Sequence, residues 1–156
     1  MTAHTLSEVV REAALLVTCG PGGVGKTTTA AALGIGAARS GRRVVVVTID
    51  PARRLADALG IDHGATSTPR LVEGVGAKGG SFSALMLDAE STFAQLVRER
   101  AGDAADGILA NRVYRSIAGS LAGAQEYMAV ERLHQLHHSG DYDLVVLDVM
   151  LPGMDG

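Results

Sequence analysis

One segment of eight residues, 20–27, could bind phosphate through the types and spacing of its residues. The segment is Gly20, Pro21, Gly22, Gly23, Val24, Gly25, Lys26 and Thr27. They satisfy the pattern G-x-x-x-x-G-K-[ST]. The glycines let successive backbone amides point at a phosphate, and a helix that starts here presents its positive end to the same anion. Lys26 is expected to reach the β- and γ-phosphates, and the Thr27 hydroxyl is expected to bind Mg²⁺. The segment predicts a nucleoside triphosphate site in which residues 20, 22–27 and Thr28, on the same helical turn, contact the nucleotide.

Three aspartates are candidates to complete this site. Asp50 and Asp148 each follow an apolar run typical of a buried strand, so their carboxylates are expected at the carboxyl edge of a sheet. We expect Thr27, Asp50 and Asp148 to be the Mg²⁺ ligands. Asp57 lies seven positions after Asp50 and could orient or deprotonate a water molecule. The expected catalytic residues are Lys26, Asp50 and Asp57. In the alternative interpretation Asp50 caps a helix and Asp57 lies on a solvated helix face.

The elements that would position these residues alternate between strand and helix. Residues 15–19 predict a buried strand, 27–39 a helix and 43–49 a second buried strand beside the first. Further along the chain, a short helix is expected at 53–59, a surface loop at 62–80 and a strand at 83–87. Helices are expected at 89–100, 104–116 and 122–138, and a last strand at 143–147. The predicted fold class is α/β of the P-loop NTPase type, with a mainly parallel sheet flanked by helices.

Composition limits the classes of function. The 156 residues are 47% hydrophobic and only 3% aromatic, which fits one domain, 1–156, with an aliphatic core. A net charge of −3 gives no basic surface for nucleic acid. The first apolar run is too short for a signal peptide or a membrane span, so we expect a cytoplasmic protein. Cys19, the one cysteine, is expected to be a small buried residue, and the histidines at 134, 137 and 138 are expected at a solvated helix end.

Three longer stretches carry a resemblance to a known family: CGPGGVGKTTTAAALG, VVVVTIDPARRLADALG and AGAQEYMAVERLHQL. They resemble the ArsA-like P-loop ATPases, which include arsenical pumps and ATPases that target tail-anchored proteins. The resemblance covers residues 15–148. It implies ATP and Mg²⁺ as ligands, ATP hydrolysis, a homodimer that opens and closes with nucleotide, and a protein or membrane-protein partner. It also implies that DPARRLAD is a switch segment in which Asp57 places the hydrolytic water.

Two departures from the family pattern leave alternatives open. Pro21 stands where the class usually has a lysine that reaches the partner's phosphates, which allows a nucleotide-binding module without hydrolysis. Residues 148–156 resemble the phospho-acceptor segment of a receiver domain, which allows phosphorylation of Asp148 instead. Because family members continue past this point, the domain is expected to be incomplete, with a bare sheet edge.

Overall fold

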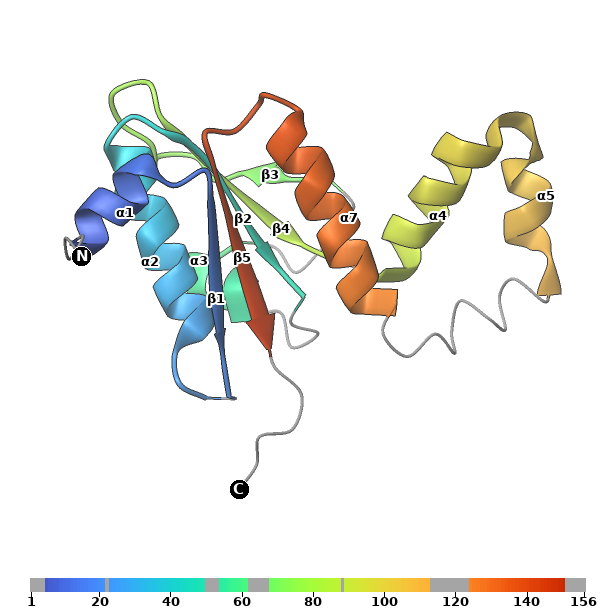
Figure 1. Ribbon diagram of the computed structural model, residues 1–156, viewed down its shortest axis with the longest axis horizontal. Helices are drawn as coiled ribbons and strands as arrows, with labels where there is room; N and C mark the ends of the chain where they lie inside the picture. Colours follow the sequence, from blue (N-terminus) through green and yellow to red (C-terminus); the bar gives the residue numbers. More distant parts are fainter. Residues whose placement is uncertain are drawn as a thin grey trace, which may run out of the picture.

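The computed structural model of the chain has a five-stranded sheet with helices on both of its faces (Figure 1). It describes residues 5–21, 23–49, 54–61, 68–87, 89–112 and 124–150. In chain order the elements are α1 (Leu6–Glu12), β1 (Leu15–Gly20), α2 (Lys26–Arg39), β2 (Arg43–Thr48), α3 (Arg54–Leu59), β3 (Arg70–Leu71), β4 (Ser81–Met86), α4 (Ala89–Ala101), a 3-10 turn (Gly102–Ala104), α5 (Ala105–Ala110), α7 (Ala124–His138) and β5 (Leu144–Met150). The predicted α/β class with a mainly parallel sheet is confirmed.

The strands lie in the order β1-β5-β2-β4-β3. All neighbouring pairs are parallel except the pair of β3 with β4, which is antiparallel. The last strand along the described chain, β5, therefore lies between β1 and β2. Since the carboxyl ends of parallel strands meet at one edge, the residues that end β1, β2 and β5 are brought together there.

Two apolar layers hold the sheet between its helices. On one face Val44 and Val46 pack with Phe82 and with the alanines of α2, and on the other Val45 and Val47 pack with Leu136 of α7. Val44, Val45, Val46 and Val47 are all fully buried, as expected for a central parallel strand covered on both faces. Figure 1 shows α2 on one side of the sheet and α7 on the other, with α4 and α5 extending beyond α7.

Helix α1 precedes the first strand, and we did not predict it from the sequence. The Thr5 hydroxyl accepts a hydrogen bond from the Glu8 backbone amide, and the Glu8 carboxylate accepts one from the Thr5 amide. This reciprocal capping box also lowers the pKa of Glu8, chiefly through the hydrogen bond from the Thr5 backbone. The spacing T-x-x-E before an apolar run is the sequence signal that could have identified the helix.

The structure corrects the expectations for β1. It is not a strand buried on both faces, because it lies at the edge of the sheet and only alternate residues are covered. Val17 is 52% exposed, and Cys19 is exposed rather than buried. Nor does β2 lie beside β1, since β5 separates them.

Other boundaries also differ from the prediction. The last strand continues to Met150, so Asp148 lies within β5 and not after its end. The expected loop 62–80 contains the short strand β3, and the expected helix 104–116 is interrupted at Asn111, which has an extended backbone conformation between α5 and the helical Arg112. Residues 113–123 lie outside the described part of the chain.

Candidate functional site

The loop after β1 leads directly into α2. Gly23 has a φ of 81° and Gly25, the residue before the helix, a φ of 84°, which is the left-handed region that favours glycine. A hollow of about 260 Å³ opens at this turn and is lined by Gly23, Gly25, Lys26, Thr27 and Thr28. The first turn of α2, all of which the structure describes, carries no acidic residue. The positive end of the helix therefore faces the hollow without a neighbouring carboxylate on that turn.

Lys26 folds back over the loop. Its ammonium Nζ donates a hydrogen bond to the Pro21 carbonyl oxygen at 2.6 Å. A lysine ammonium has three donors, so this bond leaves further donors for an anion in the hollow. The same contact shows that Pro21, which lacks a side-chain charge, still takes part in the loop through its backbone.

Among the residues that the structure describes, Asp148 is an acidic residue that lies beside the loop. It is 4% exposed, and its carboxylate accepts hydrogen bonds from three hydroxyl groups. Thr27 Oγ1 donates to Asp148 Oδ2 at 2.6 Å, Thr48 Oγ1 donates to the same oxygen at 3.2 Å, and Thr18 Oγ1 donates to Asp148 Oδ1 at 3.1 Å. A buried carboxylate without partners would be costly, and these hydroxyls supply the partners.

The other site residues expected from the sequence do not hydrogen-bond the Asp148 carboxylate in the described structure, or lie outside the described residues. Asp57 lies in α3 with an exposed side chain, and α3 packs against α2. Val24 is 62% exposed, and Thr28 is exposed at the mouth of the hollow. Gly22 and Asp50 lie outside the described residues. Sequence reasoning did not identify Thr18 and Thr48 as neighbours of Asp148, because that contact depends on the strand order.

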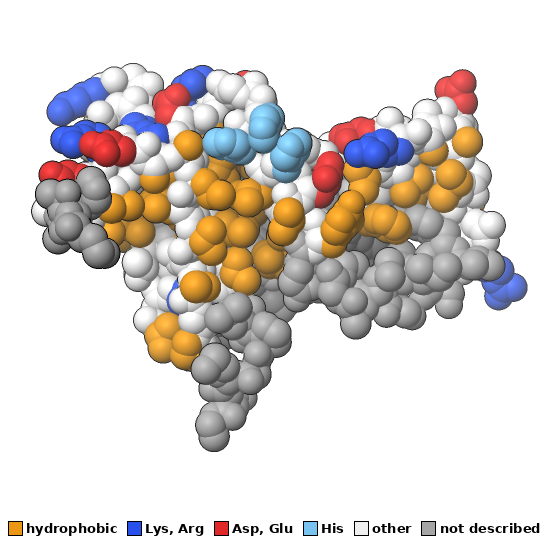
Figure 2. Space-filling model, viewed as in Figure 1, with side chains coloured by type: hydrophobic (Ala, Val, Ile, Leu, Met, Phe, Trp, Pro, Cys, Tyr) orange, Lys and Arg blue, Asp and Glu red, His pale blue; other side chains and the backbone are white. Residues whose placement is uncertain are grey.

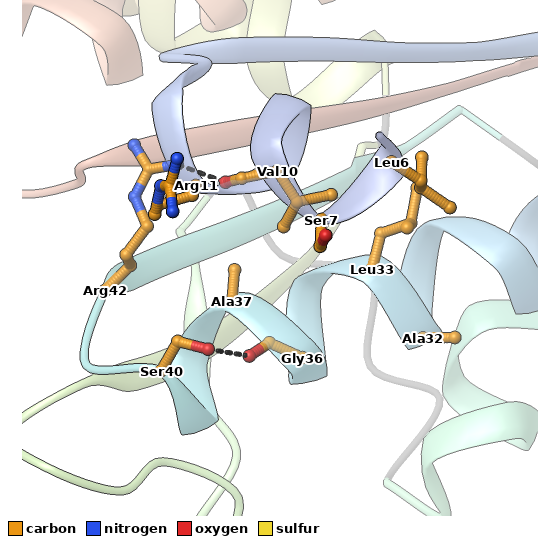
Figure 3. Close-up of a pocket in the computed structure, with 10 residues that line it drawn as sticks. All are labelled: Leu6, Ser7, Val10, Arg11, Ala32, Leu33, Gly36, Ala37, Ser40 and Arg42. Carbon is orange, nitrogen blue, oxygen red and sulfur yellow. Dashed lines mark hydrogen bonds between the residues drawn. The ribbon is translucent and has the colours of Figure 1, made fainter. Parts of the chain in front are cut away.

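A larger hollow of about 780 Å³ lies between α1 and α2, away from the loop (Figure 3). It is lined by Leu6, Ser7, Val10, Arg11, Ala32, Leu33, Gly36, Ala37, Ser40 and Arg42. Both arginines already have partners: Arg42 donates to the Val10 and Asp143 carbonyl oxygens, and Arg11 pairs with Glu12 at 3.0 Å. The smaller hollow is the better candidate site because it combines a helix start, a lysine and a neighbouring carboxylate.

The histidines at the end of α7 do not form a second site of this kind. His134, His137 and His138 are all exposed, as expected from the sequence, and Nδ1 of His138 lies 2.9 Å from the His134 carbonyl oxygen. Among the described residues, no three His, Cys, Asp or Glu side chains are grouped closely enough to hold a metal ion. None of the described helices is long and apolar enough to cross a membrane.

Comparisons with known proteins point to one family. The family described as anion-transporting ATPase matches residues 13–153. The chain is 33% identical to ATPase ARSA2 of Chlamydomonas reinhardtii over 157 residues, which cover 98% of this chain and 40% of that protein. It is 30% identical to ATPase get3 of Aspergillus niger over 154 residues, which cover 96% of this chain and 43% of that protein. The chain therefore spans about two-fifths of the length of these relatives.

Proposed function

We propose, since the chain belongs to the anion-transporting ATPase family, that it binds ATP with Mg²⁺ at the loop between β1 and α2 and hydrolyses it. The relatives are named as ATPases, and they are longer proteins. The observation that carries the proposal is the 2.6 Å hydrogen bond between Thr27 Oγ1 and Asp148 Oδ2 beside the hollow at the start of α2. This bond joins the phosphate loop to β5, the strand that carries Asp148.

The loop would bind the phosphates. The two left-handed glycines, Gly23 and Gly25, let the backbone turn tightly before α2, and the positive helix end favours an anion in the hollow. Lys26 would exchange its bond to the Pro21 carbonyl for contacts with the β- and γ-phosphates. Because phosphoryl transfer depends mainly on positioning and neutralising charge, this lysine is the main catalytic residue that we propose.

Thr27 and Asp148 have the donor chemistry that Mg²⁺ prefers. One supplies a hydroxyl oxygen and the other a carboxylate, and both are hard oxygen ligands. Bound Mg²⁺ would neutralise charge on the phosphates. Asp50 is a further proposed ligand because it follows β2, whose carboxyl end lies at the same edge of the sheet. Asp57 is proposed, from the family resemblance, to place the attacking water. The exposed position of Asp57 on α3 leaves its side chain accessible to solvent.

The decisive experiment compares two substitutions of cationic residues on α2. Lys26→Ala removes the proposed phosphate contact, whereas Arg39→Ala removes a charge at the far end of the same helix. Hydrogen bonds to charged groups contribute about 1.5–3 kcal/mol, so Lys26→Ala should weaken ATP binding by about tenfold to a hundredfold. Arg39→Ala should leave it unchanged. Calorimetric titration with ATP and Mg²⁺ measures the affinity, and phosphate release measures turnover.

The same measurements decide between the two nucleotide-binding alternatives. ATP binding together with phosphate release that Lys26→Ala abolishes supports the ATPase. If the chain binds ATP but shows no phosphate release that depends on Lys26, it is a module that binds nucleotide without hydrolysing it. The replacement of the usual lysine by Pro21 would allow this outcome. Absence of ATP binding by the wild-type chain would overturn the proposal.

We also propose that two copies of the chain associate in the cytoplasm when ATP is bound, and that they act on a protein or membrane-protein partner. Support comes from the family resemblance alone. Light scattering of the wild-type chain should give twice the monomer mass with Mg²⁺ and a slowly hydrolysed ATP analogue, and the monomer mass with ADP. A monomer mass under both conditions would contradict the dimer without affecting the nucleotide site.

A further inference from the structure

Two threonines outside the phosphate loop contact the buried carboxylate of the site. Thr18 lies on β1 and Thr48 on β2, on either side of Asp148 on β5. Thr18 Oγ1 donates to Asp148 Oδ1 at 3.1 Å, and Thr48 Oγ1 donates to Asp148 Oδ2 at 3.2 Å. Thr48 is itself 1% exposed. Neither threonine has a role in the function proposed above.

The strand register explains how the three side chains meet. Asp148 is paired with Thr18 across β1 and β5, and with Thr48 across β2 and β5. Residues paired in register on neighbouring parallel strands point to the same face of the sheet. The three side chains therefore form a row on one face, and Thr27, from the first turn of α2, meets this row at Asp148 Oδ2.

We propose that Thr18 and Thr48 are positioning residues that hold the Asp148 carboxylate in the orientation it needs to act with Thr27 on Mg²⁺. The inference rests on the proposed function and extends it to two residues. Thr18 bonds one carboxylate oxygen and Thr48 the other, so rotation of the carboxylate breaks both hydrogen bonds. A carboxylate oxygen has about two acceptor positions, so the Thr18 bond leaves capacity at Oδ1 for a further partner.

A purely structural role for the two hydroxyls makes a different prediction. Any buried carboxylate requires hydrogen-bond partners, and losing one would lower the stability of the fold without a selective effect on metal. A positioning role would instead weaken the response to Mg²⁺ while leaving the contacts of the loop with the phosphates intact. The two roles are therefore separated by comparing nucleotide binding with and without Mg²⁺.

The test uses matched substitutions in the full chain. Thr18→Val and Thr48→Val remove the hydroxyl and keep the branched shape, whereas Thr18→Ser and Thr48→Ser keep the hydroxyl. The control is Thr92→Val in α4: Thr92 is 7% exposed, and its hydroxyl has no hydrogen-bond partner within the described residues. The probe is ATPγS, with binding followed by calorimetry in EDTA and by thermal stabilisation across a Mg²⁺ titration.

Loss of a residue that orients a metal ligand typically costs about 10–100-fold in metal affinity. Each valine variant should therefore need about 10–100-fold more Mg²⁺ for half-maximal stabilisation. The ATPγS affinity of each valine variant in EDTA should equal that of the wild type. The serine variants and Thr92→Val should match the wild type in both Mg²⁺ dependence and ATPγS affinity. Because Thr18 is only partly buried on an edge strand, Thr18→Val tests the role even where Thr48→Val fails to fold.

Several outcomes would overturn the positioning role. The positioning role fails, while the proposed function stands, if the wild-type chain binds ATPγS with Mg²⁺ and the valine variants show the same Mg²⁺ dependence. It also fails if their affinity in EDTA falls by the same factor, or if the serine variants are as impaired as the valine variants. If the wild-type chain binds no ATPγS at all, the proposed function fails and the positioning role fails with it.

Discussion

At the scale of single residues, the surroundings of Asp148 bear on the alternative in which it accepts a phosphoryl group. Its side chain is 4% exposed and lies within β5, which is paired with a strand on each side. Three threonine hydroxyls already hydrogen-bond its carboxylate. A phosphodonor would have to displace these hydroxyls to reach it. The arrangement therefore favours an Asp148 carboxylate that acts unmodified beside Thr27 over one that accepts a phosphoryl group.

A second aspartate, Asp143, makes the stability of the fold depend on pH through its ion pair with Arg43. Its Oδ2 accepts a hydrogen bond from the Arg43 backbone at 2.8 Å, and its Oδ1 lies 2.7 Å from Arg43 Nη2. The side-chain hydrogen bond from Arg43 is the main reason why the pKa of Asp143 is lowered in the folded chain. The unfolded chain therefore binds the proton first as pH falls. The stabilisation is complete above the ordinary aspartate pKa and is lost as pH falls through the lowered pKa.

We therefore expect Asp143→Asn to lower the free energy of unfolding at pH 7, and to differ less from the wild type at about pH 3, below the ordinary value of about 3.9. The effect should be small because both side chains are more than a third exposed. Urea unfolding at the two pH values measures it. Glu73→Gln, which changes an exposed carboxylate on a turn, is the control. A difference that grows on acidification would contradict the assigned role of the pair.

At the scale of elements, α2 approaches the sheet so closely that a side chain at Gly34 would overlap its core neighbours unless they shifted. An added Cβ at Gly34 would lie 2.7 Å from Val46 Cγ2 and 2.8 Å from Phe82 Cε2, whereas at Gly36 it would meet nothing within 4 Å. Both neighbours of Gly34 belong to the packed core, where side chains have little room to move. Close packing here fixes the position of α2 against β2 and β4, and thereby the position of Lys26 and Thr27 at its start.

The pair of glycines provides a matched test. Gly34→Ala should destabilise the chain by about 1–3 kcal/mol because it overpacks the core. Gly36→Ala should stabilise it by about 0.5–1 kcal/mol because alanine loses less backbone entropy in a helix. Urea unfolding of both variants measures the difference. Equal effects of the two substitutions would mean that α2 does not pack on Val46 and Phe82 as described.

The elements also show what local sequence could and could not predict. Apolar runs and the glycine-rich loop predicted β1, α2, β2 and β5 within a few residues, because these signals are local. The exposed half of β1 was not predictable in this way, since an apolar run has the same appearance in a central strand and in an edge strand. Only the strand order, which depends on contacts distant in sequence, distinguishes the two.

At the scale of the whole molecule, the strand order determines the site. Lys26, Thr27 and Asp148 were all identified from residue types and spacing, and the structure brings Thr27 and Asp148 together. The contributions of Thr18 and Thr48 were not predictable, because they require β5 to lie between β1 and β2. The sequence suggested instead that β1 and β2 are neighbours, since consecutive strands of a βαβ unit often are.

The same order leaves one face of β1 open. Val17 and Cys19 pair in register with Leu147 and Val149, so they lie on the face of the sheet that α7 covers. That helix contacts β5 but leaves Val17 52% exposed and Cys19 exposed. Figure 2 shows hydrophobic side chains gathered in the middle of this view, over β1, β5 and α7. A contiguous apolar surface of this kind favours contact with another surface.

Cys19 reports directly on this open face. A maleimide should label it in the folded chain at nearly the rate seen in denaturant, because the thiol is exposed. The matched control moves the single cysteine into the core: in Cys19→Ser with Ala84→Cys, position 84 is 1% exposed and should react only when the chain unfolds. Mass spectrometry over time measures both rates. If copies of the chain cover the face by associating, Cys19 should react more slowly as the chain concentration rises. Slow labelling at every concentration, with the control variant folded, would instead mean that β1 is covered within a single chain and is not the exposed edge of the sheet.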